Sequence, residues 1–274
     1  MTDQTNAHPK NAESQLLIRV TGIKKSFGDN QVLDGVSFHV NAHETVGIIG
    51  ISGCGKSTLL RIISGLEAAD AGEVCLGSQN FSLVFQYSAL FDSLTVLENV
   101  AFSLTEKSDT EFQKALQSGK NQSPLSKRTA QVSLTSGEIR QLALEKLRLL
   151  GLEGIEDLYP NELSGGMKKR VSFARAIAAN PGIILYDEPT AGLDPIASTM
   201  IEDYMEKMRS EMNAASIVVT HQFSTIARTN RVILLHKGCI QWTGTPDELR
   251  YTSNPYARQF ADARVEGPMA LEHR

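Results

Sequence analysis

The sequence predicts an α/β fold in which helices cover both faces of a mostly parallel sheet. Strand-like apolar runs alternate with helical segments through the last third of the chain, and this alternation is typical of parallel sheets. A glycine-rich loop at residues 50–55 joins one such run to a helix, as phosphate-binding loops do. The middle of the chain has a helical pattern, and we interpret it as a subdomain inserted into the sheet core.

The predicted strands are short and apolar, and the turn residues Gly28-Asp29-Asn30 separate the first two. They lie at residues 16–20, 36–40, 46–49, 73–76, 82–85, 183–186, 217–220, 232–235 and 240–243. Residues 96–104 have a helical pattern. The segment Thr135-Ser136-Gly137-Glu138 resembles a capping box that begins a helix through residue 150.

The composition indicates an ordinary globular protein of one large or two small domains, with 274 residues, 41% of them apolar and 21% charged. Its net charge of −4 gives no overall attraction to nucleic acid. No apolar run in the sequence approaches the roughly 18 residues that cross a bilayer. We expect residues 1–14 to form a mobile polar leader without a signal-peptide core. The three cysteines lack the spacing of a metal site or disulfide, which favours a reducing cytoplasm.

Residues 50–58 match the phosphate-binding pattern GxxxxGK[ST]. Glycines let the backbone approach phosphate oxygens closely, and N–H groups at a helix N-terminus point toward negative charge. We expect Lys56 to reach the β- and γ-phosphates and the Ser57 hydroxyl to bind Mg²⁺. The predicted nucleotide ligands are Gly50, Ser52, Gly53, Cys54, Gly55, Lys56, Ser57 and Thr58. A chance match is disfavoured by the flanking strand and helix, so the sequence predicts a protein that binds a nucleoside triphosphate.

Two acids, Asp187 and Glu188, follow the apolar run at residues 183–186. An acid at the tip of a strand beside the phosphate-binding loop can hold Mg²⁺ through water, which suits Asp187. Glu188 can polarise a water in line with the γ-phosphate as a general base. The alternative, a pair of solvated turn acids, is disfavoured by the apolar run before them and by the phosphate-binding loop.

A second anion site is predicted where Leu163-Ser164-Gly165-Gly166 precedes a helix, because the free N–H groups of a helix N-terminus attract anions. The basic run at residues 168–170 follows directly. We expect these three side chains to lie on a solvated helix face. Contact with the ribose of ATP or with a partner is the alternative.

The phosphate-binding loop, the segment at residues 163–166 and the acids at 187–188 follow one another along the chain. Together they resemble the ATP-binding cassette (ABC) family over residues 16–250. The resemblance implies a P-loop NTPase cassette at residues 15–250, with a mostly parallel sheet core, an antiparallel β subdomain, and a helical subdomain inserted at about residues 87–180. It also implies that Phe27 stacks on adenine, that Gln86 contacts Mg²⁺, that Asp194 crosses a dimer interface and that His221 holds the γ-phosphate.

The same resemblance implies the mechanism. Two copies meet head to tail around two ATP molecules with Mg²⁺, so that each nucleotide contacts Lys56 and Ser57 of one chain. The other chain contributes Ser164, Gly165 and Gly166. Hydrolysis opens the homodimer and drives a change in an integral membrane permease. The chain is then a peripheral subunit on the cytoplasmic face of the inner or plasma membrane.

Several segments are similar to one branch, the Mce/Mla-type phospholipid-transport ATPases. They are residues 85–102, the methionine at 167, residues 186–196, and a C-terminal extension at residues 251–274. This branch implies an Mce-type lipid-binding protein as a partner, and the C-terminal tail could bind a small regulatory subunit. The main alternative is a cassette for another solute, such as an amino acid, a metal or a drug. A soluble cassette acting on DNA or ribosomes is disfavoured by the single phosphate-binding loop and the lack of heptads.

A polar stretch at about residues 105–135 is longer than that branch usually has. Its composition favours a disordered surface loop. The alternative is a docking segment near the membrane, suggested by its basic residues Lys120, Lys127 and Arg128.

Overall fold

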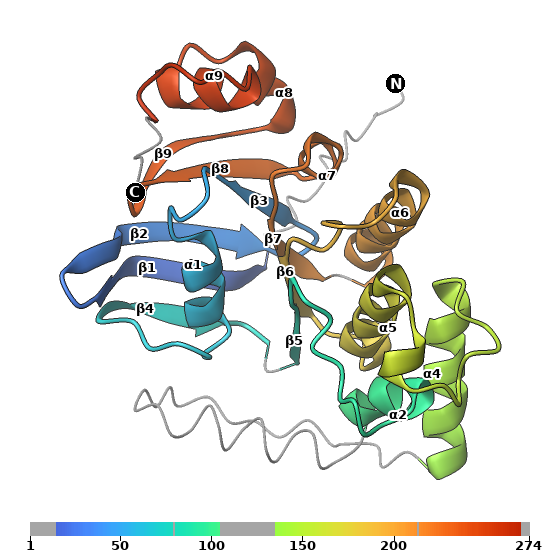
Figure 1. Ribbon diagram of the computed structural model, residues 1–274. Helices are drawn as coiled ribbons and strands as arrows, with labels where there is room; N and C mark the ends of the chain where they lie inside the picture. Colours follow the sequence, from blue (N-terminus) through green and yellow to red (C-terminus); the bar gives the residue numbers. More distant parts are fainter. Residues whose placement is uncertain (1–14, 79, 105–134, 213, 270–274) are drawn as a thin grey trace, which may run out of the picture.

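The strands form two sheets in the computed structural model, which describes residues 15–78, 80–104, 135–212 and 214–269 (Figure 1). The larger sheet has, in spatial order, β5 (Phe81–Val84), β6 (Ile183–Asp187), β7 (Ala215–Val219), β3 (Thr45–Ile49), β8 (Arg231–His236) and β9 (Cys239–Gly244). All neighbours pair in parallel except β9, which runs antiparallel to β8. The predicted mostly parallel sheet is confirmed.

The smaller sheet is antiparallel and has the spatial order β2 (Asn30–Asn41), β1 (Leu16–Phe27) and β4 (Ala71–Leu76). The first strand extends seven residues beyond the predicted range of 16–20. The sequence pattern misses this extension because the register shifts between Val20 and Ile23, where Gly22 has a φ of 60°. An irregularity of this kind interrupts the alternation of buried and exposed side chains that identifies a strand.

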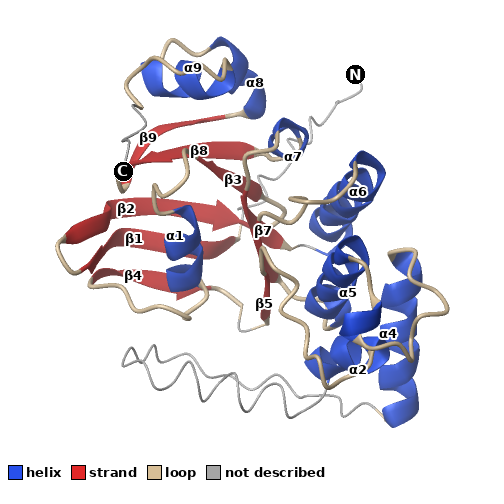
Figure 2. Cartoon of the chain, in the orientation of Figure 1, coloured by secondary structure: helices blue, strands red, loops and turns tan. Residues whose placement is uncertain are grey.

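Helices surround the larger sheet and form a separate group beyond it (Figure 2). They are α1 (Lys56–Ile63), α2 (Val96–Ala101), α4 (Ser136–Leu149), α5 (Gly165–Ala178), α6 (Pro195–Met212), α7 (Phe223–Ala227), α8 (Pro246–Tyr251) and α9 (Pro255–Ala261), with 3₁₀ turns at Phe102–Leu104 and Pro160–Glu162. The capping box predicted at Thr135 is present, since its side chain accepts from the Glu138 N–H while the Glu138 carboxylate accepts from the Thr135 N–H. Helices α2, α4 and α5 contact one another and form the inserted helical subdomain.

Successive residues of β6 pack on opposite faces of the larger sheet, as the pleat of a strand requires. Ile183 and Leu185 belong to a core shared with α1 and the smaller sheet. Ile184 and Tyr186 belong to a second core, shared with α2, α4, α5 and α6. Both faces are therefore covered as predicted, and the smaller sheet forms part of one covering layer.

The residues after β9 fold onto the far edge of the larger sheet through α8 and α9 (Figure 1). Met269 is buried there, in a third core with Val232 and Leu249. The predicted leader at residues 1–14 lies outside the described residues, as does the predicted polar insertion apart from Thr135. Within the described ranges, no helix combines the length and the apolar character of a membrane span.

Candidate nucleotide-binding site

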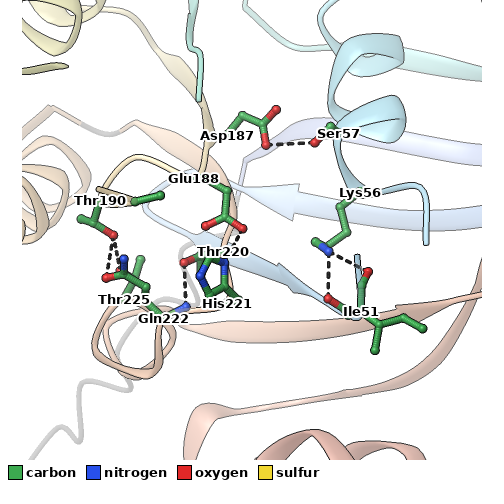
Figure 3. A network of polar contacts seen from close by, with 12 residues as sticks. Ile51, Lys56, Ser57, Asp187, Glu188, Thr190, Thr220, His221, Gln222 and Thr225 are labelled. Carbon is green, nitrogen blue, oxygen red and sulfur yellow. Dashed lines mark hydrogen bonds and ion pairs between the residues drawn. The ribbon is translucent and has the colours of Figure 1, made fainter. Parts of the chain in front are cut away.

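The glycine-rich loop begins where β3 ends and closes at the first turn of α1. Lys56 begins that helix, and its Nζ donates to the carbonyl oxygens of Gly50 at 2.8 Å and Ile51 at 3.0 Å (Figure 3). The loop is therefore folded around the ammonium group of its own lysine. This places a positive charge at the N-terminus of α1, where backbone N–H groups add to the attraction for anions.

Two glycines of the loop occupy positions where a side chain would collide with backbone. Gly50 has a φ of 150°, and a Cβ there would lie 2.2 Å from the carbonyl oxygen of Leu235. Gly55 has a φ of 104°, and a Cβ there would lie 2.9 Å from the carbonyl oxygen of Val32. The loop thus passes between β8 and the start of β2, which fixes its path. Cys54, beside Gly50, is buried, and burial raises the pKa of its thiol.

Asp187 ends β6 and contacts the phosphate-binding loop's helix although β7 lies between β6 and β3. The Ser57 hydroxyl donates to Asp187 Oδ1 at 3.1 Å, so the two predicted Mg²⁺ ligands meet. Burial raises the pKa of Asp187, the neighbouring Glu188 charge raises it further, and the Ser57 hydrogen bond lowers it.

The donor set fits Mg²⁺ chemically, because this cation prefers a few oxygen ligands together with waters and phosphate oxygens. Ser57 and Asp187 supply a hydroxyl and a carboxylate oxygen that already face each other. No cluster of three or more His, Cys, Asp or Glu with metal-binding geometry occurs in the described part of the chain. A site of this type does not require one.

Glu188 is held between β6 and the residues after β7. Its N–H donates to the carbonyl of Val219 at 2.9 Å, and its Oε1 lies 2.8 Å from His221 Nδ1 (Figure 3). Its Oε2 is buried and has no hydrogen-bond partner among the described residues, so it can accept a hydrogen bond from a water. Glu188 also has a φ of 50°, a left-handed conformation that costs a non-glycine residue about 1–2 kcal/mol.

A buried polar network next to this pair was not predicted. The Thr190 hydroxyl donates to Gln222 Oε1 at 3.0 Å and lies 3.3 Å from the Thr225 hydroxyl (Figure 3). Thr225 in turn donates to Glu202 on α6 at 2.6 Å. The network connects the residue after His221 to the turn that follows Glu188. Its members come from three separate segments, so no local pattern could have revealed it.

The prediction that the basic run at residues 168–170 lies on a solvated helix face is wrong for two of its three members, Lys169 and Arg170. Lys169 Nζ donates to the carbonyl oxygen of Glu188 at 3.0 Å and to that of Ala191. Arg170 donates to the carbonyl oxygen of Leu150 at 3.0 Å. Both side chains are half-buried and donate to backbone carbonyls of other segments.

Phe27, Gln86 and Asp194 form no hydrogen bond with Lys56 or Asp187 among the described residues. Phe27, at the end of β1, is half exposed and lies under the Lys25 ammonium, 5.0 Å from the ring centroid. Gln86 follows β5 at the same edge of the sheet as Asp187, is exposed, and forms no hydrogen bond with Ser57 or Asp187. Asp194 caps α6, accepting from the N–H groups of Ile196 and Ala197, both at 3.0 Å.

Ser164, Gly165 and Gly166 form the N-terminus of α5. The Ser164 hydroxyl accepts from the Met167 N–H at 3.2 Å, and both Ser164 and Gly165 are exposed. Figure 1 shows α5 and α1 on different sides of strand β6. Within one chain, therefore, the second predicted anion site does not meet the phosphate-binding loop.

A comparison with protein families matches residues 33–191 to the family described as "ABC transporter". The Arabidopsis thaliana protein TRIGALACTOSYLDIACYLGLYCEROL 3, chloroplastic, is 39% identical over 288 residues, covering 94% of this chain and 76% of that protein. The sulfate/thiosulfate import ATP-binding protein CysA of Bordetella pertussis is 37% identical over 243 residues, covering 85% of this chain and 63% of that protein.

Two solved structures have the same fold over 84% of this chain and 99% of their own. One is a dimeric post-hydrolysis state of an ATP-binding cassette bound to ADP and Pi, with a TM-score of 0.69 and 29% identity. The other is a dimeric bacterial ABC transporter cassette, with a TM-score of 0.70 and 30% identity.

Proposed function

The chain belongs to the ABC transporter family as its ATP-binding, ATP-hydrolysing subunit, and from this premise we propose that it powers the transport of phospholipids between membranes. The observation that carries the lipid proposal is the Arabidopsis relative, which is similar over 94% of this chain. That relative is named after trigalactosyldiacylglycerol, a glycolipid. The Mce/Mla-like segments at residues 85–102 and 186–196 also favour a lipid cargo, and within that class they favour phospholipids.

Each nucleotide is bound by residues of the loop at 50–58, with Lys56 on the β- and γ-phosphates and Phe27 against the adenine. Ser57, Asp187 and Gln86 hold Mg²⁺, which neutralises charge on the phosphates when bound. Glu188 accepts a proton from the attacking water, and His221 holds the γ-phosphate. The contact between Glu188 and His221 and the free Oε2 of Glu188 support these two roles.

Two copies are needed for a complete site. Ser164, Gly165 and Gly166 are exposed or partly exposed at the N-terminus of α5, away from their own phosphate-binding loop (Figure 1), so they are available to a nucleotide of a second chain. Asp194 lies at the same interface. Similar cassettes that are dimers support this arrangement. The permease docks near Gln86. An Mce-type lipid-binding protein lies beyond the membrane. The chain itself is peripheral to the inner or plasma membrane.

A second candidate is supported by a specific observation. The CysA relative is 37% identical to this chain, and its name states that it imports sulfate or thiosulfate. The chemistry of hydrolysis is the same in either case, so only the partner and the cargo distinguish them.

The experiment is purification of the tagged chain from gently solubilised native membranes, followed by mass spectrometry of the proteins and lipids that accompany it. We expect a multi-span permease, an Mce-domain protein and phospholipid. A permease that accompanies a receptor for a soluble solute would contradict the lipid proposal and leave the ATPase unaffected.

A further inference from the structure

Lys169 connects the N-terminal part of α5 to the turn that carries Glu188. Its Nζ donates to the Glu188 carbonyl oxygen at 3.0 Å and to the Ala191 carbonyl oxygen. The same Glu188 oxygen accepts from the Ala191 N–H at 3.2 Å. The ammonium group therefore bridges both ends of one turn, and this turn leads from β6 into the loop that ends at Asp194.

The turn has a conformation that needs support. Glu188 has a φ of 50°, and residues in this region persist only where their surroundings hold them there. The N–H of Glu188 is fixed by Val219 and its carboxylate by His221. Its carbonyl oxygen is fixed by the contacts with Ala191 and Lys169. Among these contacts of Glu188, the one with Lys169 connects it to α5.

The helix begins at Gly165, and its N-cap Ser164 lies five residues before Lys169. Its first turn also lies against the loop, since a Cβ on Gly166 would meet Leu193 at 3.6 Å. A rigid helical turn thus joins the exposed Ser164 end to the carbonyl oxygen of Glu188. Displacement of one end must move the other or break the Lys169 hydrogen bonds.

We infer that Lys169 is a positioning residue that couples the two nucleotide sites of the dimer. This inference rests on the proposed dimer and on the proposed role of Glu188 as the general base. Nucleotide contacted by Ser164–Gly166 in one site orders α5, and Lys169 transmits that order to Glu188 of the other site. An ammonium group is suited to this task because it donates to two carbonyl oxygens at once and is unusually strong as a charged donor. Burial lowers the pKa of Lys169, and the Glu188 charge opposes that shift.

The test compares the full chain with its variants Lys169→Met and Lys169→Arg. Methionine keeps the unbranched shape without the donors, and arginine keeps charged donors. Lys207→Met, which removes an exposed lysine of α6, is the matched control. Steady-state hydrolysis is measured against MgATP concentration, with ATP affinity and melting temperature recorded for every variant. A Hill coefficient of about two is expected for the wild-type dimer.

We expect Lys169→Met to lower turnover about tenfold, as the loss of one charge-assisted hydrogen bond would, and to reduce the Hill coefficient to about one. ATP affinity should change by less than about twofold, and Lys169→Arg should retain most of the turnover. Wild-type turnover and cooperativity in Lys169→Met would overturn the inference, as would an equal loss in Lys169→Arg. Cooperativity that is present in the wild type and unchanged in Lys169→Met would overturn the coupling inference alone. A wild-type chain without cooperativity would also contradict the proposed two-site dimer.

Discussion

The imidazole of His221 and the carboxylate of Glu188 are in direct contact, with Nδ1 2.8 Å from Oε1. An ionised carboxylate can only accept hydrogen bonds, so the Nδ1–H of His221 is the donor in this contact. The other ring nitrogen, Nε2, belongs to a side chain that is 65% exposed and can meet a ligand. The contact therefore orients two groups at once: Oε2 of Glu188 toward a water and, when the imidazole carries both protons, the Nε2–H of His221 toward a phosphate oxygen.

Replacing Glu188 by glutamine should stop hydrolysis and leave ATP binding intact. The amide keeps the size of the side chain and can still contact His221, but it cannot accept a proton. Loss of a general base lowers the rate by about 10²–10⁴-fold. Phosphate release and equilibrium binding of ATP are measured together, and size-exclusion chromatography should detect a trapped dimer. Glu211→Gln, at an exposed carboxylate of α6, is the control. Hydrolysis at the wild-type rate in Glu188→Gln would contradict the assigned role.

Replacing Asp187 by asparagine should stabilise the chain at neutral pH while abolishing hydrolysis. Burial raises the pKa of Asp187 above its ordinary value of 3.8, so the folded state binds more protons than the unfolded state between the two pKa values. The stabilising contribution of Asp187 is therefore fully present below the pKa that it has in the unfolded chain. This contribution is lost as the pH rises through the pKa that Asp187 has in the folded chain.

Asparagine removes this penalty and can still accept the Ser57 hydrogen bond. Without nucleotide, Asp187→Asn should melt a few degrees above the wild type at about pH 7. This difference in melting temperature should vanish at about pH 4. Thermal unfolding at several pH values measures it, with the exposed Asp157→Asn as control. A difference that does not depend on pH would show that ionisation of Asp187 is not its source.

The parts of the molecule that sequence analysis could predict are those determined by neighbouring residues. The phosphate-binding loop is a run of nine residues, and strand β6 is an apolar run up to its last residue, Asp187. The Thr135 capping box needs only residues three apart. Each of these patterns is fixed by local backbone geometry, so a single segment contains the whole signal.

The partners of long side chains could not be predicted in the same way. Lys169 reaches carbonyl oxygens 19 and 22 residues further along the chain, and Thr190 meets Thr225 across 35 residues. A lysine beside two other basic residues has the pattern of a solvated surface. Only the packing of α5 against the Glu188 turn directs its ammonium group inward.

Alanine at Gly50 should be much more disruptive than alanine at Gly53, although both glycines have a positive φ. At Gly53 a Cβ would meet nothing within 4 Å, whereas at Gly50 it would collide with Leu235 backbone and with Cys54 Sγ. We expect a loss of about 1 kcal/mol of unfolding free energy for Gly53→Ala and about 2–4 kcal/mol for Gly50→Ala. Denaturant unfolding of the two variants measures the difference. Equal losses would mean that backbone conformation alone, and not the close approach of β8, determines the need for glycine.

Alanine at Gln259 should destabilise the C-terminal part of the chain without changing turnover. The Gln259 amide is buried in α9, donates to the carbonyl oxygens of Arg264, Val265 and Met269, and accepts from the Met269 N–H at 2.7 Å. Truncation leaves the buried N–H of Met269 without this partner, which costs about 1–3 kcal/mol. Met269 then loses its place in the core beside β8.

Denaturant unfolding and hydrogen exchange at the Met269 amide measure this effect, with the exposed Gln141→Ala of α4 as the control. Gly267→Ala offers an independent route to the same result, because a Cβ at Gly267 would lie 2.4 Å from the Gln259 amide. Faster exchange with unchanged hydrolysis is expected in both variants, since Gln259 makes its contacts within the C-terminal segment. If hydrolysis fell as well, the segment would have to act on the nucleotide site through β8, whose residue Leu235 contacts the phosphate-binding loop at Gly50.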